Sequence, residues 1–353
     1  MDRCNQSPAA LRWLICAAAA PLMAGAALAQ DQDADDGAGD DPAARTPAAA
    51  IDDAGNGHRG IFHFNQDASD GTQQANVAAL AFVAAEGAAI ADSAATQGSG
   101  ATSLIAANAG LAADASMSRI ANDAAGIIGM NQSAASGSQQ INSAAIARTA
   151  GPGGLAMASA AATGNAAGTP IAALLPPGSS SASMDGVGNA ASGIIQINQI
   201  AGLGGRQANL VAIAAAPGGA ALAEVISEGD RPNAADAYSG AAGPVALINS
   251  FNAASGLVQI NQASGSGNAQ ANLLAAAFGG FADAQVVSDA GLGQATGSPV
   301  ESPLPEGEGR IALGSSFEGF SGVAQVSQVS GHGNQTTNTI SASFGALAGG
   351  GAP

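Results

Sequence analysis

Apolar and polar residues alternate with a period of two in five similar segments of this chain. The clearest segment, GLVQINQASGSGNAQANLLAAAF, covers 256–278, and the other four begin at Gly60, Gly126, Gly193 and Gly322. Successive segments start 66, 67, 63 and 66 residues apart. Alternation on both sides of a glycine-rich turn predicts two strands folded over each other as an arch. Repetition at a nearly fixed period is typical of stacked structural units and not of an enzyme fold.

Each segment carries amides and a glycine at fixed positions. The glutamines six residues after each starting glycine are Gln66, Gln132, Gln199, Gln262 and Gln328. The asparagines sixteen residues after it are Asn76, Asn142, Asn209, Asn272 and Asn338. The glycines eleven residues after it are Gly71, Gly137, Gly204, Gly267 and Gly333. Identical amides stacked at one strand spacing hydrogen-bond along the stack, whereas identical charges there repel each other. We therefore expect two amide columns along the stack and a glycine turn in every arch.

The alternation also predicts which residues face each other inside an arch. Before the turn, even offsets from the starting glycine hold two apolar residues and then Gln262; after it, they hold Gln270, Asn272 and then apolar residues. We expect these two even-offset faces to contact each other, with amides near the bend and apolar side chains farther away.

Further strands are expected outside the arches. Upstream of the fourth arch, Val245, Leu247 and Phe251 form an alternating pattern, which predicts a third strand followed by a short turn. Two alternating stretches in the connectors, Leu222 to Ser227 and Ala284 to Ser288, are candidates for a fourth strand. The expected fold is all-β: a β-solenoid or stack of amyloid-like β-arches, with flexible connectors rich in Ala, Gly and Pro. The five-repeat region is 49–344, with repeat cores 49–82, 115–148, 182–215, 245–278 and 311–344, followed by a flexible tail over 345–353.

The N-terminus has the pattern of an export signal. An arginine-containing segment precedes an apolar run and the small-residue ending Ala27-Leu28-Ala29, which predicts a signal peptide over 1–29. An uncleaved membrane anchor is the alternative, although the run is short and rich in alanine. An acidic, disordered leader is expected over 30–48. Both cysteines lie inside the predicted signal, so the exported chain needs no disulfide.

Composition excludes several classes of function. Residues 30–353 contain seven arginines, no lysine and 25 acidic residues, a net charge of −18. Such a chain is a poor ligand for nucleic acid or anionic lipid. Residues 245–278 contain no charged residue at all, and most acids lie outside the repeats, where they keep adhesive strands soluble.

The candidate chemical motifs fit repeat positions better than reactive sites. His58 and His63 lie close together, but His63 takes the offset that holds glutamine in three other repeats, and no partner ligands accompany it. His332 lies in a glycine turn and is expected to be exposed. The Gly-x-Gly pairs join two strands and do not open a helix as a phosphate loop would. We find no catalytic constellation and expect neither enzymatic activity nor a metal or other cofactor.

The recurring order of the motifs Asn-Gln, Gly-x-Gly and Gln-x-Asn resembles that in the repeats of bacterial functional amyloids. The segments 126–147 and 193–215 are similar to the repeats of Fap fibre proteins, and 262–268 is similar to a curlin repeat with one extra residue. Holdfast-attachment adhesins are a related possibility. The resemblance implies self-association or association with related fibre subunits, export through an outer-membrane pore, and nucleation by a partner subunit.

Two hypotheses for function follow. The first is a secreted structural protein on the outer surface of a bacterium, either a fibre subunit or a short rod, that serves adhesion or the biofilm matrix. The alternative is a monomeric β-solenoid that binds a surface polysaccharide through its connectors. A species that sediments and binds thioflavin would favour the first hypothesis.

The repeats are predicted to differ in their tendency to assemble. The peptide 256–278 is uncharged and has a complete amide set, whereas the peptide 60–82 contains Asp67 and Asp70, which would repel their copies in a neighbouring chain. We expect the first peptide to form fibres faster at neutral pH, as measured by thioflavin fluorescence. Faster assembly of peptide 60–82 would mean that the connectors drive association.

Overall fold

The computed structural model describes eleven stretches of the chain: 48–68, 72–99, 114–134, 137–166, 179–202, 204–230, 241–265, 267–280, 284–292, 310–331 and 333–345. These stretches form nineteen β-strands in four parallel sheets. The described residues contain no helix and therefore none long and apolar enough to cross a membrane. The prediction of an all-β stack of repeats is confirmed.

Each sheet collects one strand from successive repeats. The first sheet contains β1 (Ala48–Asp52), β5 (Asp114–Ser118), β9 (Ser179–Asp185), β13 (Ala241–Ile248) and β17 (Ile311–Gly314). The second contains β2 (Arg59–Asp67), β6 (Ala125–Ala134), β10 (Ser192–Ala201), β14 (Ser255–Ser264) and β18 (Ser321–Ser330). The third contains β3 (Gln73–Val83), β7 (Gln139–Thr149), β11 (Arg206–Ala216), β15 (Ala269–Gly279) and β19 (Gln335–Gly345). The fourth contains β4 (Ala88–Ser99), β8 (Leu155–Ala166), β12 (Ala220–Asp230) and β16 (Ala284–Leu292).

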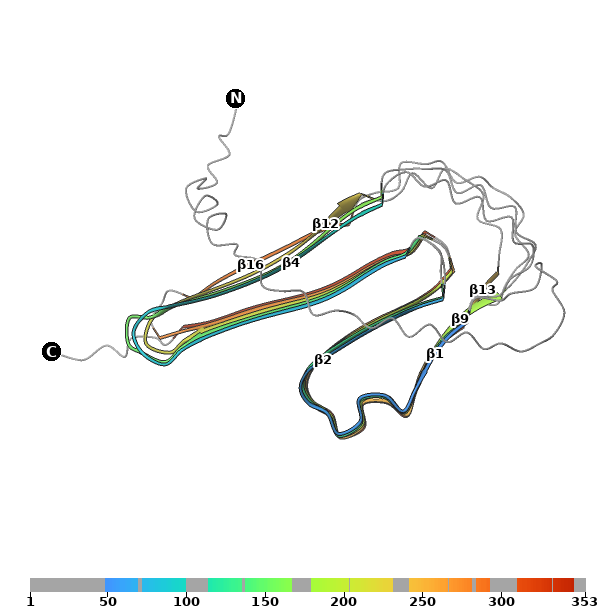
Figure 1. The fold of residues 1–353 in the computed structure, drawn as a ribbon, viewed down its shortest axis with the longest axis horizontal. Helices are drawn as coiled ribbons and strands as arrows, with labels where there is room; N and C mark the ends of the chain where they lie inside the picture. Colours follow the sequence, from blue (N-terminus) through green and yellow to red (C-terminus); the bar gives the residue numbers. More distant parts are fainter. Residues whose placement is uncertain are drawn as a thin grey trace, which may run out of the picture. The chain divides into compact units, whose positions relative to one another are not determined.

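The strands of one repeat form a rung, and the five rungs stack in register. Starting glycines pair with each other from rung to rung, as Gly126 does with Gly193 and Gly193 with Gly256. Strands of different repeats therefore overlie one another along the stacking direction (Figure 1). Every inner strand is hydrogen-bonded on both edges, which is the arrangement that the repeat spacing requires.

The third and fourth strands of the repeat are both present. The strand expected upstream of the fourth arch is β13, and every other repeat has an equivalent strand in the first sheet. The two connector stretches lie within β12 and β16, which are longer than the alternating pattern indicated. Two more fourth-sheet strands, β4 and β8, occur in the first two repeats, where the sequence had not indicated them.

The structure corrects the expected facing of the arch. In β14, the even-offset residues Val258 and Ile260 pack with Leu247 in one cluster, so they face the first sheet and not the third. The odd-offset residue Leu257 instead packs with Leu274 of β15, between the second and third sheets. After the turn, the even-offset residues face the other strand of the arch, as predicted. Before the turn, the odd-offset residues face it instead.

The glycine turn causes this reversal. Gly265 and Gly267 have φ angles of 95° and 68°, which an extended strand does not contain. The side-chain alternation is therefore not carried across the turn. Because the second sheet lies between two others, both of its faces are buried in the inner rungs, and the pattern of its strands alone could not show which face meets which neighbour.

Small side chains fill the space between the third and fourth sheets. This cluster is built mainly from alanines, with Ile141, Leu210, Leu273 and Val225 as its larger buried members. The cluster between the first and second sheets has larger residues, including Met117, Met184 and Phe251. The chain thus has several thin cores, each repeated along the stack, in place of one aromatic core.

The close approach of successive rungs at the starting glycines generates a prediction. A Cβ atom on Gly193, whose φ is 111°, would overlap the carbonyl oxygen of Gly126. We expect Gly193→Ala to lower the free energy of unfolding by at least ~2 kcal/mol in urea denaturation of the soluble chain. Gly57 has a φ of 66° but no atom within 4 Å of its Cβ position. The control Gly57→Ala should therefore cost only about 1 kcal/mol, and equal losses would contradict the role of close packing.

Candidate functional site: amide columns and open end rungs

The five expected glutamines lie in one column on the second sheet. Gln132 donates from Nε2 to Oε1 of Gln66 at 3.0 Å, and the next three steps of the column are each 2.8 Å long. The same amide groups donate to first-sheet carbonyls: Gln262 Nε2 lies 2.9 Å from the oxygen of Ala246. The column therefore joins rung to rung and also joins the first sheet to the second.

The five expected asparagines form a second column on the third sheet. Each Nδ2 donates to Oδ1 of the asparagine one rung earlier, over distances of 2.8 to 3.0 Å. A facing column on the second sheet, Asn65, Asn131, Asn198 and Asn261, interleaves with it. Asn272, for example, donates to Oδ1 of Asn261 at 3.0 Å, and Asn261 donates to Oδ1 of Asn209 at the same distance. The two columns form a continuous zigzag between the sheets.

Two further glutamine columns were absent from the expected stacking set. One follows Gln74, Gln140, Gln207 and Gln270, and the other follows Gln196, Gln259 and Gln325. Their Nε2 atoms donate toward the later rung, opposite to the two expected columns. The sequence signal was the same amide at the same offset in several repeats. In the second of these columns it was weakened, because the first two repeats have His63 and Gly129 where the later ones have glutamine.

The expected turn glycines close the arches where the structure describes them. The φ angles of Gly137, Gly204, Gly267 and Gly333 are 71°, 62°, 68° and 69°. Residues with a Cβ atom avoid this left-handed region, so glycine is the natural residue there. Gly71 and His332 lie outside the described residues.

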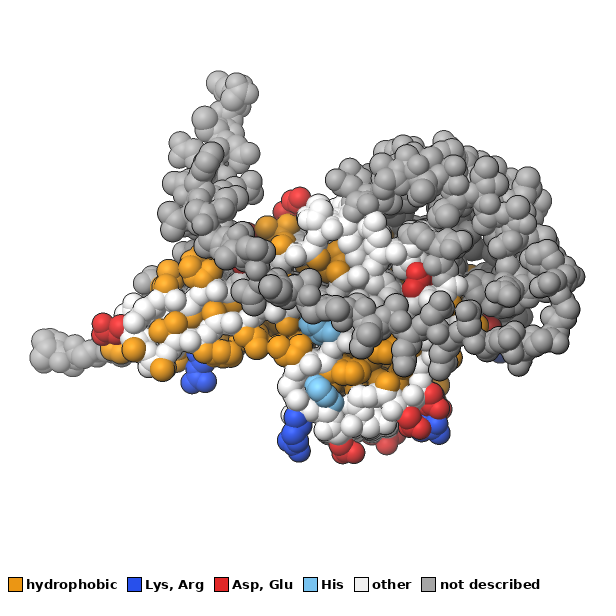
Figure 2. Space-filling view, viewed as in Figure 1, with side chains coloured by type: hydrophobic (Ala, Val, Ile, Leu, Met, Phe, Trp, Pro, Cys, Tyr) orange, Lys and Arg blue, Asp and Glu red, His pale blue; other side chains and the backbone are white. Residues whose placement is uncertain are grey.

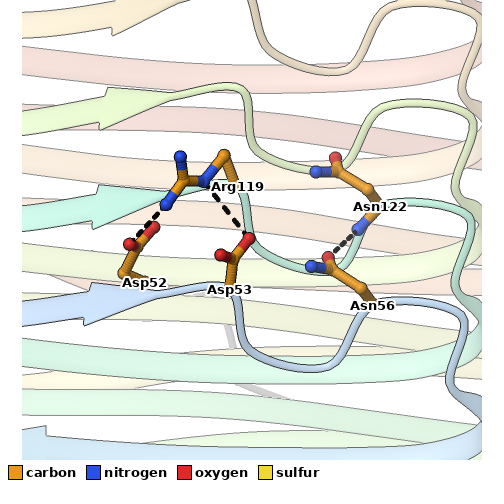
Figure 3. Close-up of polar contacts among 5 residues, drawn as sticks. All are labelled: Asp52, Asp53, Asn56, Arg119 and Asn122. Atoms are coloured by element: carbon orange, nitrogen blue, oxygen red, sulfur yellow. Dashed lines mark hydrogen bonds and ion pairs between the residues drawn. The ribbon is translucent and has the colours of Figure 1, made fainter.

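A charged cluster lies where the first rung turns from β1 toward β2 (Figure 3). Arg119 of the second rung binds Asp52 through Nη2 at 2.6 Å and Asp53 through Nε at 3.2 Å. The two carboxylates, first Asp52 and then Asp53, hold the pKa of Arg119 above its ordinary value. All three side chains are more than half exposed, so we assign these pairs little stability.

The same turn contains an asparagine column that binds backbone. The backbone N–H of Asn122 donates to Oδ1 of Asn56 at 2.8 Å (Figure 3). In the same way, the N–H of Asn189 donates to Oδ1 of Asn122 and the N–H of Asn252 donates to Oδ1 of Asn189. The N–H of Glu318 donates to Oδ1 of Asn252 and ends the series. Side chains thus hold the irregular turns at the same spacing as the strands.

The two end rungs leave apolar side chains uncovered. On the fifth rung, Leu313 and Ile340 are 57% and 36% exposed, whereas the residues beneath them, Leu247 and Leu274, are 0% and 7% exposed. On the first rung, Ile61 is 49% exposed above a buried Ile127. Figure 2 shows a face on which hydrophobic side chains lie beside other, uncharged groups, with histidine side chains among them.

The described residues offer little for metal chemistry. No group of three or more His, Cys, Asp or Glu side chains able to hold a metal ion occurs among them. What the arrangement provides is a set of hydrogen-bonding columns and two open edges. Both are suited to association with another β-stack.

Comparison with known proteins gives one result. The model of the functional amyloid protein FapB/FapC family matches residues 25–216 and 172–345. Together these ranges cover most of the chain. No curated protein and no solved structure matches it.

The zigzag of asparagines generates a prediction about stability. Asn209 donates to Asn142, to Asn198 and to the carbonyl of Ile197, each at 3.0 Å. Asn209→Asp would put a carboxylate oxygen against these three acceptors, so we expect it to lower the free energy of unfolding by at least ~3 kcal/mol.

The matched control is Asn338→Asp in the same column. Asn338 lies in the last described rung and is only half-buried, so water can solvate the new carboxylate. We expect less than half the loss seen for Asn209→Asp in urea denaturation of the soluble chain. Equal losses would mean that the zigzag adds no stability beyond that of an exposed amide.

Proposed function

Because the chain belongs to the functional amyloid protein FapB/FapC family, we propose that it is exported and forms fibres on the bacterial surface that serve adhesion or the biofilm matrix. In such a fibre, the first rung of one copy lies on the fifth rung of another, and the columns continue through the junction. The observation that carries this proposal is the pair of open end rungs, whose uncovered apolar residues have buried equivalents in the inner rungs.

The direction of the hydrogen bonds supports stacking in this order. Each glutamine of the expected column donates to the rung before it, as Gln328 does to Gln262. A first rung placed on the fifth would let Gln66 donate to Oε1 of Gln328 in the same way. The asparagine column has the same direction, so Asn76 would donate to Asn338. Reversing one copy would break the parallel strand order.

Charge does not oppose this contact. The strands β18 and β19 contain no ionisable residue, and Asp52 and Asp53 of the first rung are already paired with Arg119. In register, these two aspartates would lie beside Gly314 and Ser315 of the preceding copy, which carry no charge. Repulsion between identical charges, the main obstacle to in-register stacking, is thus avoided at this edge.

Export belongs to the same proposal. The signal pattern over 1–29 supports removal of the N-terminus during export, and we propose passage through an outer-membrane pore and nucleation by a related subunit. Deleting the gene in its bacterium should remove surface fibres and reduce attachment to a surface, and both should return on complementation. Normal attachment without the protein would refute the adhesive role, while a purified chain that stays monomeric would favour the polysaccharide-binding alternative.

A charge placed on an end rung tests the assembly directly. Leu313→Lys should leave the soluble chain folded, because this side chain is 57% exposed. In a fibre the ammonium group would be buried against an apolar column, so we expect elongation of wild-type seeds to slow at least about tenfold, equivalent to roughly 1.4 kcal/mol.

The control is Leu155→Lys on an inner rung. Leu155 is 37% exposed on the outer face of the fourth sheet, away from both ends. This variant should elongate as the wild type does in a thioflavin assay with pelleting. Equal inhibition by both variants would place the growth surface elsewhere than at the end rungs.

A further inference from the structure

His63 takes the place of a glutamine in one of the amide columns. In register it pairs with Gly129, then with Gln196, Gln259 and finally Gln325 of the fifth rung. The first rung thus ends this column with an imidazole, and the fifth rung ends it with a carboxamide. If rungs of two copies stack as proposed above, on which this inference rests, the two end groups of the column meet.

Gln325 shows which way its amide would donate. Gln196 and Gln259 each contact two third-sheet carbonyls through Nε2, and each also donates to Oε1 of the next rung, at 3.0 and 2.7 Å. Gln325 makes the same two carbonyl contacts, to Leu273 and Asn338, both at 3.1 Å. By the repeat, its third acceptor lies in the next rung, where the following copy would place His63.

The orientation of the imidazole suits this role. A Cβ atom on Gly129, in the second rung, would lie 3.2 Å from Cδ2 of His63. Cδ2 therefore points toward the second rung. Nδ1 is on the opposite edge of the ring and so points toward the open end. A neutral imidazole with Nδ1 unprotonated accepts a hydrogen bond there, whereas an imidazolium has only donors.

We propose that Nε2 of Gln325 in one copy donates to the His63 imidazole of the next, so that the fibre junction forms only when His63 is neutral. Acidification would then turn an acceptor into a donor that faces another donor. It would also bury a positive charge in a part of the junction that consists of amides and apolar groups. The junction becomes a site of pH control over assembly.

No neighbouring charge would compensate. On the third sheet, His63 faces the region of Asn76, and on the second rung it faces Gly129. Neither β3 nor β6 contains an ionisable residue, and neither do β18 and β19 of the preceding copy. On its own strand, Arg59 and Asp67 are each four residues away, about 13 Å along the strand. His58 contacts Phe62, with ring centroids 5.3 Å apart.

The direction of the pH effect follows from the cost of charging the group. Partial burial already lowers the pKa of His63 below 6.5. Docking of a second copy would remove more water from the ring and lower the pKa further. Assembly is therefore favoured above the pKa of the free chain and is progressively lost as the pH falls through it.

The test compares seeded elongation of the full exported chain at pH 7.5 and 5.5, a range in which aspartates with ordinary pKa values stay ionised. We expect wild-type elongation to be about three- to tenfold slower at pH 5.5, because an imidazole whose pKa lies below 6.5 stays neutral in roughly a tenth or more of the molecules there. His63→Gln restores the residue of the later repeats and should differ less than about threefold between the two pH values. His58→Gln should behave as the wild type does.

Each outcome decides one question. Wild-type fibres that elongate equally at both pH values would overturn the His63 proposal, as would a His63→Gln variant that keeps the full pH dependence. Loss of the pH dependence in His58→Gln would also overturn the proposal, because His58 would then be the titrating group. If the wild type forms no fibres at pH 7.5, the proposed function itself fails. Circular dichroism of the soluble chains at both pH values checks that folding is unchanged.

Discussion

Every part of this structure depends on parallel, in-register pairing of each residue with its own equivalent one rung away. The backbone supplies the hydrogen bonds of four sheets, and the side chains must then tolerate a similar side chain about 4.8 Å above and below. Amides satisfy this requirement best, because each carboxamide donates on one side and accepts on the other. In the inner rungs, the asparagines and glutamines of the columns are buried, and each has partners in the column. Their burial is stable because the columns satisfy them.

The same constraint explains where other residue types occur. Ionisable residues lie in turns, near strand ends and, as Asp92, Glu228 and Asp289 do, at exposed positions of the fourth sheet, where water screens them. Arg119 bridges the two adjacent aspartates of the rung below. The last rung shows the reverse adaptation on its outer face. Thr339 and Ser341 of β19 stand above Leu273 and Ala275 of β15 and are exposed. Among the described residues the fifth rung has no fourth-sheet strand of its own, and Ser341 Oγ lies 2.7 Å from Ser288 Oγ of β16, in the rung before. Hydroxyl groups are therefore found where the apolar layer of the inner rungs loses its cover.

The sequence was sufficient to predict the features that repeat. Alternation around the glycine turns indicated the arches, and Val245 and Leu247 indicated the first-sheet strands. It failed where a segment has little contrast: β8, from Leu155 to Ala166, consists mostly of Ala, Ser and Thr, so its alternation is not visible. It also failed at the glycine turn, because positive φ angles at Gly265 and Gly267 break the count of faces. Among the columns, the one that ends in His63 was the hardest to find, since two of its five members are not glutamine.

The departures from perfect repetition have a physical role of their own. An amide column would tolerate a shift by a whole repeat, because every rung offers the same groups. Bulky or charged side chains do not tolerate such a shift, because several of them lie against a glycine in a neighbouring rung. A Cβ atom on Gly188 would lie 2.5 Å from the ring of Phe251, and one on Gly164 would lie 3.0 Å from Nε of Arg206.

Such pairs distinguish one rung from the next. Phe251 fits above Gly188 and would clash with a larger residue at that place, while the Arg206 guanidinium fits only where the fourth sheet has glycine. His63 fits beside Gly129 by the same rule. The amides thus make stacking favourable for any rung, and the irregular residues with their glycines specify which rung follows which. A chain of five identical repeats would keep the first property and lose the second, since nothing would then oppose a slip by one repeat.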